Sequence, residues 1–292
     1  MLLGVHVAQS SKTLDDKKTR QLHETLKLEM DILGLNSAQI FVSNPRTSLP
    51  AKINYDALQQ ACSDIDLSVH SPYASVGIWK VNNDNKTTPS SKQKIGMFKN
   101  QMELTQKAGA WCLVLHITKL LPENVVETMN IIKPIAKQTG VKIGLEMVAN
   151  KADREKTYET PEKIDNLIML LGQKTYYGIV VDTSHIHGAG IDCSSYESMK
   201  NWFDRLTYKK RIVMFHLNGS YAERGSGKDK HAIPFSAEDK IWHGIEPSKS
   251  GVRAVVEFAN QHSIPMIVEV NRGTQAEVVE SLEIIKQLGG AV

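Results

Sequence analysis

The chain has 292 residues, of which 41% are hydrophobic and 23% are charged. This composition provides enough apolar material for a sizeable core and excludes an intrinsically disordered chain. The formal net charge of +3 is a mild basic excess, which tolerates a polyanionic partner but does not by itself indicate a nucleic-acid-binding domain.

The three cysteines, Cys62, Cys112 and Cys193, are odd in number and widely spaced. They predict neither a disulfide framework nor a CxxC zinc site, so reduced, intracellular thiols are expected. The first apolar run is too short for a signal peptide, and no stretch approaches the roughly 18 apolar residues of a membrane span. We expect a monomeric cytoplasmic or nuclear protein that binds no membrane. Because no linker or repeat divides the chain, residues 1–292 are expected to form one domain.

Short apolar runs rich in β-branched residues recur along the chain, as strands buried in a parallel sheet do. In chain order they are LLGVHV near the start, AQIFV (38–42), IDLSVH (65–70), CLVLH (112–116), KIGLE (142–146), GIVVD (178–182), IVMFH (ending at His216) and PMIVE (265–269). Segments between them, such as TRQLHETLKLEMDILG and AEVVESLEIIKQLG, space their apolar residues at the helical period. Eight alternating strands and helices favour an α/β fold with a single (β/α)₈ TIM barrel over a doubly wound open sheet.

Residue types that bind metals stand at the ends of strand after strand. In a (β/α)₈ barrel these ends converge on one face, so residues distant in sequence are expected to meet there. The DTSH motif after one strand and a D-x-H pair in an extended loop add further ligands to the same face. The nine candidates are His70, His116, Glu146, Asp182, His185, His216, Asp229, His231 and Glu269.

Imidazole and carboxylate ligands without thiolates suit Zn²⁺ or Mn²⁺. Nine ligands suffice for three such ions if a carboxylate bridges two of them. Four carboxylates contribute −4 against +6 from three divalent ions, so the loaded site is expected to be cationic and to attract a phosphate. Without metal the acids repel one another, which makes the metal obligatory. The remaining histidines (6, 23, 187, 243, 262) are interpreted as non-ligands, with His6 a candidate for the pocket wall.

At these residues the chain resembles endonuclease IV, a zinc-dependent abasic-site endonuclease family in the xylose-isomerase-like barrel superfamily. The motifs DTSHIHGAG and GSGKDKH carry the resemblance most specifically. Weaker support comes from VHSPY, LVLH, GLE, FHLN and IVE, so that the resemblance spans nearly the whole chain. The pattern is also compatible with a divergent viral branch of the family, in which case a location in the virion is expected.

The resemblance implies a DNA repair hydrolase that cleaves the phosphodiester 5′ to an abasic site in duplex DNA, leaving a 3′-hydroxyl and a 5′-deoxyribose phosphate. It implies three zinc ions per chain, with Mn²⁺ as an alternative at some sites. Their ligands would be His70, His116 and Glu146 for one ion, Glu146, Asp182, His216 and Glu269 for the second, and His185, Asp229 and His231 for the third. Glu146 and Glu269 would orient the attacking water. By position, Gln39, Arg46 and Tyr73 are the expected DNA contacts.

The chain departs from the family pattern at three places. Gly219 stands where the family usually has an acidic residue, SAEDKIWHG replaces a glycine-rich turn after the D-x-H motif, and MVAN follows Glu146. None of these changes removes a metal ligand. We therefore expect them to affect substrate fit and rate rather than the type of reaction.

Two other functions are open at this point. A sugar isomerase or epimerase of the same superfamily would use Glu146, Asp182, His216 and Glu269, but would not require the remaining five ligands. A catalytically inactive barrel that recognises damaged DNA is the other alternative. The number of metal ions bound per chain discriminates between the nuclease and the isomerase.

Overall fold

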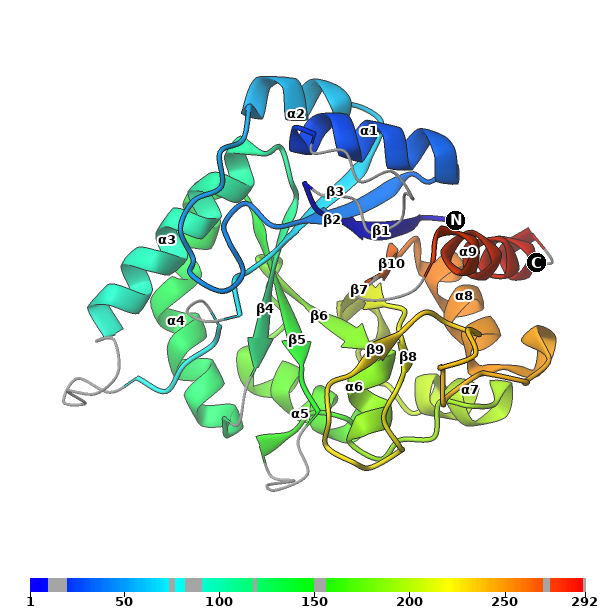
Figure 1. Ribbon diagram of the computed structural model, residues 1–292. Coiled ribbons are helices and arrows are strands. Elements are labelled where there is room, and N and C mark those ends of the chain that lie inside the picture. The colour runs from blue at the N-terminus through cyan, green and yellow to red at the C-terminus, as the bar shows by residue number, and fades with distance from the viewer. Residues whose placement is uncertain are drawn as a thin grey trace.

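The computed structural model describes residues 1–9, 20–73, 77–81, 91–117, 120–149, 156–269 and 274–290. Within this part of the chain, eight parallel strands close into a barrel with helices around the outside (Figure 1). The barrel strands are β1 (Leu3–Val7), β2 (Ser37–Ile40), β3 (Asp66–His70), β4 (Cys112–Ile117), β5 (Lys142–Met147), β6 (Tyr177–Asp182), β7 (Ile212–His216) and β10 (Met266–Val268). Each strand pairs with the next one along the chain, and β10 closes the barrel against β1. The predicted TIM barrel is confirmed, and its strand bounds agree with the sequence analysis to within one or two residues.

The helices pack an apolar face against the barrel. In α1, the buried side chains Leu22, Leu26, Met30 and Leu33 recur every three or four residues, which places them along one stripe. Together with α1 (Leu22–Leu33), the helices are α2 (Tyr55–Ala61), α3 (Ser91–Lys107), α4 (Pro122–Thr139), α5 (Pro161–Leu171), α6 (Thr183–Gly188), α7 (Tyr196–Asp204), α8 (Gly251–His262) and α9 (Gln275–Gly290). None of these described helices is long and apolar enough to cross a membrane.

Alternate residues of each strand face opposite sides of the barrel wall. The residues that face inward form their own buried apolar cluster, which consists of Cys112, Val114, Val180, Met214 and Ile267. Their neighbours in sequence, such as Leu113, Val181 and Phe215, belong to the larger core between the sheet and the helices. Two residues beyond Val114, Val180, Met214 and Ile267 stand His116, Asp182, His216 and Glu269. The predicted ligands are therefore the next inward-facing layer, directly above an apolar plug.

A short antiparallel ribbon that the sequence analysis did not predict follows β7. It pairs β8 (Gly219–Ser220) with β9 (His231–Ala232), and Ser220 lies opposite His231. The ribbon returns the loop that contains Asp229 and His231 to the end of the barrel, beside β7 and α6 (Figure 1).

Candidate metal centre

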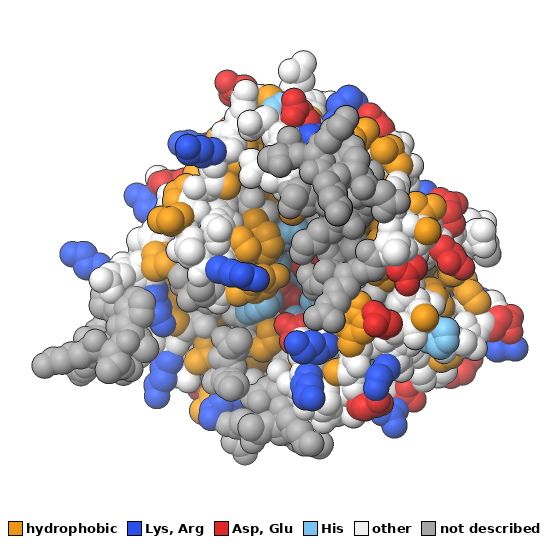
Figure 2. Space-filling model, in the orientation of Figure 1, with side chains coloured by type: hydrophobic (Ala, Val, Ile, Leu, Met, Phe, Trp, Pro, Cys, Tyr) orange, Lys and Arg blue, Asp and Glu red, His pale blue; other side chains and the backbone are white. Residues whose placement is uncertain are grey.

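The register of the barrel strands brings the predicted ligands together. His116 lies directly beside Glu146 in the β4–β5 pair, and Asp182 lies beside His216 in the β6–β7 pair. Histidine and acidic side chains gather in the hollow at the centre of the face shown in Figure 2, with lysine and arginine side chains around it. The hollow is the barrel mouth that the sequence analysis predicted.

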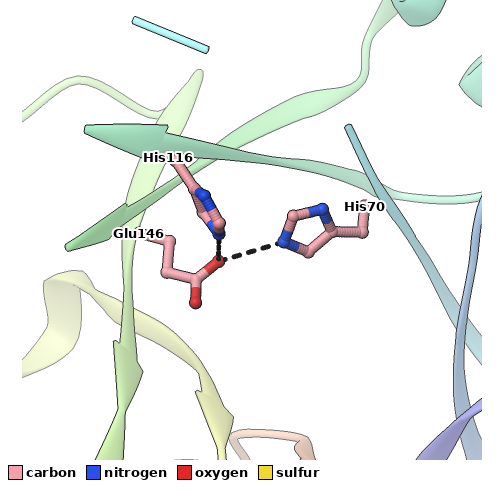
Figure 3. Close-up of side chains that lie close together, drawn as sticks. All are labelled: His70, His116 and Glu146. Carbon is pink, nitrogen blue, oxygen red and sulfur yellow. Dashed lines mark hydrogen bonds and ion pairs between the residues drawn. The ribbon is translucent and has the colours of Figure 1, made fainter. Parts of the chain in front are cut away.

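Glu146 is the shared member of the cluster. Its Oε2 atom lies 3.2 Å from Nε2 of His70 and 3.2 Å from Nε2 of His116, so both rings point at one oxygen (Figure 3). Its Oε1 atom faces the other side and lies 3.0 Å from Nδ1 of His216 and 3.3 Å from Nδ1 of His185. One carboxylate therefore contacts two separate groups of imidazoles, as a bridging ligand must.

A second group surrounds Nδ1 of His216. Glu146, Asp182 and His216 each offer a ligand atom within 4.8 Å of the others. Oε2 of Glu269 lies 3.6 Å from the same nitrogen, and Glu269 is only 7% exposed. The four residues that were predicted to share an ion therefore converge.

A third group lies toward the β8–β9 ribbon. Asp182, His185 and His231 offer ligand atoms within 4.8 Å of one another. Asp229, which is half-exposed, places its two oxygens 3.3 Å from Nε2 of His185 and 2.9 Å from Nε2 of His231. The two imidazole nitrogens are themselves 3.3 Å apart. Two ring nitrogens held this close and facing one another require a proton or a cation between them.

Hydrogen bonds on the outer side of two rings set which nitrogen is available. Nδ1 of His70 lies 2.7 Å from the carbonyl oxygen of Ser71, and Nδ1 of His185 lies 2.8 Å from that of Met147. A carbonyl oxygen only accepts, so in each ring Nδ1 donates and Nε2 keeps its lone pair toward the cluster. This arrangement, with an outer N–H on a carbonyl, is typical of metal-bound histidines.

The carboxylates are held ionised. Burial alone would raise the pKa of Glu146, but the imidazoles of His216 and His116 hold that pKa well below its usual range. Burial would likewise lower the pKa of His216, yet the carboxylates of Glu146 and Glu269 raise it to about 9. His6 differs, since burial lowers its pKa to about 4. The cluster is thus an anionic pocket that draws in positive charge.

The donor set fits divalent zinc or manganese. It combines imidazole nitrogens and carboxylate oxygens, contains no thiolate, and arranges its atoms in three groups of ligands at a single mouth. The three buried carboxylates, Glu146, Asp182 and Glu269, would repel one another without such charge. These residues therefore fit the ions that the sequence analysis expected.

Asn218 is a site residue that the sequence analysis did not assign. It is fully buried, and its Nδ2 atom lies 2.8 Å from Oδ2 of Asp182 and 3.1 Å from Oε2 of Glu269. Its Oδ1 accepts a hydrogen bond from the backbone N–H of Glu269 at 2.9 Å. Asn218 therefore orients two carboxylates at once. Its position two residues after His216, just beyond the end of β7, is the sequence feature that indicates this role.

An acidic side chain from elsewhere in the chain packs against Gly219, the position after FHLN where an acidic residue was expected. A Cβ atom at Gly219 would lie 2.5 Å from Cγ of Asp239, so the Asp239 carboxylate occupies that space. Asp239 is 1% exposed and accepts hydrogen bonds from the backbone N–H groups of Ser220, Phe235 and Ile241. It comes from the SAEDKIWHG segment, so two departures from the family pattern meet at one point.

The three predicted DNA contacts have different surroundings. Arg46 is exposed on the loop after β2. Tyr73 is 59% exposed, and its ring packs against those of His70 and His116 with centroids 5.1 and 5.5 Å away. Gln39 is 0% exposed, because it faces into the barrel from β2. The prediction that Gln39 contacts DNA does not fit this placement.

Comparison with known proteins identifies the family. Residues 31–288 match the family model described as xylose isomerase-like TIM barrel, and the chain belongs to that family. It is 31% identical over 264 residues to a probable AP endonuclease of African swine fever virus (isolate Tick/Malawi/Lil 20-1/1983), covering 84% of this chain and 82% of that protein. It is 27% identical to a probable endonuclease 4 of Listeria monocytogenes (serotype 4b, strain F2365), covering 87% and 86%.

A solved structure agrees with these relatives. The crystal structure of AsfvAP:AG superposes with a TM-score of 0.81 at 26% sequence identity, covering 98% of both chains. The resemblance to endonuclease IV is thereby confirmed, and the higher of the two sequence identities is to the viral relative.

The contact between Gly219 and Asp239 can be tested by Gly219→Ala. The added methyl group must displace Asp239 and with it the β8–β9 ribbon, which should destabilise the protein by about 1–3 kcal/mol. Gly96→Ala in α3 is the control, because a Cβ there meets nothing within 4 Å and should stabilise the helix by about 0.5–1 kcal/mol. Urea unfolding measures both changes. Equal stability of the two variants would contradict the proposed contact.

Proposed function

We propose that this protein is a metal-dependent DNA repair endonuclease that hydrolyses the phosphodiester 5′ to an abasic site. The products are a 3′-hydroxyl and a 5′-deoxyribose phosphate. The observation that carries the proposal is that three groups of ligand-type side chains share one mouth, with Glu146 and Asp182 each in two groups. The similarity to a probable AP endonuclease and a probable endonuclease 4 supports it.

The residues that would hold the ions follow from the three groups together with the contacts of Asp229 and Glu269. In this proposal His70, His116 and Glu146 hold one Zn²⁺, Glu146, Asp182, His216 and Glu269 hold a second, and His185, Asp229 and His231 hold a third. Mn²⁺ is an alternative occupant of some sites. Bound ions of this kind neutralise phosphate charge and lower the pKa of water from 15.7 towards about 7.

Glu269 is the candidate base. Its carboxylate is held by Asn218 at 3.1 Å and lies 3.2 Å from Nδ1 of His231. Burial raises the pKa of Glu269, but His216 and His231 keep it well below the usual range, so the group is ionised and can accept a proton. In hydrolysis the water gives a proton to the carboxylate while its oxygen bonds to phosphorus, the bond from phosphorus to the 3′-oxygen breaks, and that oxygen takes up a proton from solvent and is released as a hydroxyl. Glu269 and Glu146 would orient the water for this attack.

The rim supplies DNA contacts in this proposal. Tyr73 presents a largely exposed ring beside the ligands, and Arg46 presents a cation on the neighbouring loop. An abasic sugar has no base to unstack, so moving it into the mouth costs less by a few kcal/mol, which favours this substrate over an intact nucleotide. The substrate is therefore duplex DNA that contains an abasic site.

Metal analysis of the purified protein separates the nuclease from a sugar isomerase. An isomerase needs only the group around Glu146, Asp182, His216 and Glu269, whereas the structure also brings together His70, His116, His185, Asp229 and His231. We expect about three zinc ions per chain by inductively coupled plasma mass spectrometry, one for each group. A saturated protein with one or two ions would favour the isomerase.

Glu269→Gln should retain the fold and lose most cleavage. The amide is close in shape to the carboxylate but cannot accept the proton, and losses of about 10²–10⁴-fold are typical for general bases. Incision of an abasic duplex measures the rate, while circular dichroism and zinc content are followed in the same preparation. Glu280→Gln, on the exposed face of α9, is the matched control and should cleave normally. Near-wild-type incision by Glu269→Gln would refute its role.

Tyr73→Ala should weaken DNA binding without emptying the metal site. Loss of one aromatic contact costs about 1–3 kcal/mol, so we expect KM for an abasic duplex to rise about tenfold. Tyr73→Phe keeps the ring and should behave almost as the wild type. Steady-state incision kinetics with parallel zinc analysis test this, and an unchanged KM in Tyr73→Ala would exclude the contact.

A further inference from the structure

His216 has a hydrogen-bond partner unlike those of its neighbours. Its Nδ1 faces the carboxylates of Glu146, Glu269 and Asp182 at 3.0, 3.6 and 3.8 Å. Its Nε2 faces away from them and lies 2.8 Å from Nε2 of Gln39. Where the outer nitrogens of His70 and His185 meet carbonyl oxygens, the outer nitrogen of His216 meets an amide nitrogen.

Gln39 is placed to connect two imidazoles. It is fully buried within the barrel, and its Oε1 lies 3.0 Å from Nδ1 of His6 while its Nε2 reaches His216. His6, Gln39 and Ser68 are register partners across β1, β2 and β3. A buried amide in a row across three strands has little freedom except rotation of its terminal group.

When no cation is bound, the arrangement fixes where the proton of a neutral His216 ring lies. An amide NH₂ group only donates, so Nε2 of His216 must accept from Gln39. The ring proton of His216 is then on Nδ1, which donates to Oε1 of Glu146. His6 in turn donates from Nδ1 to Oε1 of Gln39.

A cation bound at Nδ1 of His216 is incompatible with that arrangement. Binding requires the lone pair on Nδ1, which leaves the proton of the neutral ring on Nε2, and this N–H needs an acceptor. The NH₂ group of Gln39 cannot accept. Rotation of the amide by about 180° exchanges two groups of nearly equal size and turns Oε1 toward His216. The NH₂ group then donates to Nδ1 of the neutral His6 ring.

We propose that Gln39 is a positioning residue of the metal centre, whose amide reverses to accept the Nε2–H of His216 when a cation binds at Nδ1. His6 completes the device, since its Nδ1 can donate to the amide oxygen or accept from the amide nitrogen. This inference rests on the proposed metal centre and assigns a role to two residues that are not ligands. Gln39 thus acts on the ion through His216.

Gln39→Met tests the need for the amide. Methionine has a similar length and is apolar, so the variant keeps the packing but leaves Nε2–H of His216 without an acceptor. Loss of such an outer hydrogen bond typically weakens metal binding about 10–100-fold, and we expect that loss for one of the bound ions. Zinc affinity is measured by chelator competition. Gln101→Met is the matched control, because Gln101 is equally buried but bonds to Ser43 in another part of the molecule.

Gln39→Glu distinguishes a hydrogen-bonding role from packing. A carboxylate accepts from both imidazoles without rotation, so we expect it to restore the zinc affinity that Gln39→Met loses. If Gln39 only fills space, a buried acid should lower the zinc affinity more than methionine does, so Gln39→Glu would bind zinc more weakly than Gln39→Met. That reversed order would overturn the proposal.

A spectroscopic measurement separates the hydrogen bond from the added charge of Gln39→Glu. In ¹⁵N-histidine-labelled wild-type protein at a pH of about 10, where a ring with a pKa of about 9 is neutral, the His216 resonances should show protonated Nδ1 without zinc and protonated Nε2 with zinc. The variant His216→Ala identifies them. An unchanged tautomer on zinc binding would overturn the inference.

The outcomes for the inference and for the proposed function are distinguishable. If wild-type protein binds zinc and Gln39→Met matches Gln101→Met in affinity, only the role of Gln39 is refuted. If wild-type protein binds no divalent cation, the proposed function fails and the inference fails with it.

Discussion

Three acidic side chains are buried together at one end of the barrel, and much of the surrounding structure compensates for their charge. Glu146, Asp182 and Glu269 are at most 7% exposed, and Asp229 adds a fourth carboxylate at the rim. Buried like charges at such distances are tolerated only with opposite charge or hydrogen-bond donors beside them. In the structure, imidazoles and the amide of Asn218 provide hydrogen-bond donors to the carboxylates. Bound divalent cations would add the opposite charge that balances them more completely. The stability of this end of the barrel is therefore linked to what binds there.

The hydrogen bonds behind the cluster explain why it keeps its shape. His70 and His185 donate to carbonyl oxygens of the residues that follow β3 and complete β5, so their rings are fixed by the strand ends themselves. Asn218 links β7 to the backbone of Glu269 after β10. Each contact ties an inward-facing side chain to the backbone of the barrel rim. The closed sheet thus sets the geometry of the ligands at the strand ends, while α6 and the β8–β9 ribbon position His185, Asp229 and His231.

Most of the barrel and the convergence of the ligands could be predicted from sequence, because buried parallel strands give continuous apolar runs and place their C-terminal ends on one face. The sequence analysis assigned Gln39 to the DNA contacts because it lies just before the loop. Alternate residues of a strand face the same side, however, so Gln39 faces into the barrel together with Ser37. The β8–β9 ribbon was missed because strands of two residues carry no periodicity. The contact between Gly219 and Asp239 depends on a distant pairing that no local pattern encodes.

The pair Gly219 and Asp239 connects two of the places where the chain departs from the expected pattern. The resemblance led us to expect an acidic residue directly after FHLN, whereas this chain has Gly219 there and packs the carboxylate of Asp239, 20 residues further along, against that glycine. Gly219 leaves space for this carboxylate because it has no Cβ atom. The carboxylate accepts three backbone N–H groups, which organises the segment that replaces the usual glycine-rich turn. The two departures from the expected pattern therefore meet in one contact, between Gly219 and Asp239. Gly219 and Asp239 are not among the nine ligand-type residues, so both departures leave unchanged the set of atoms that can face a metal ion.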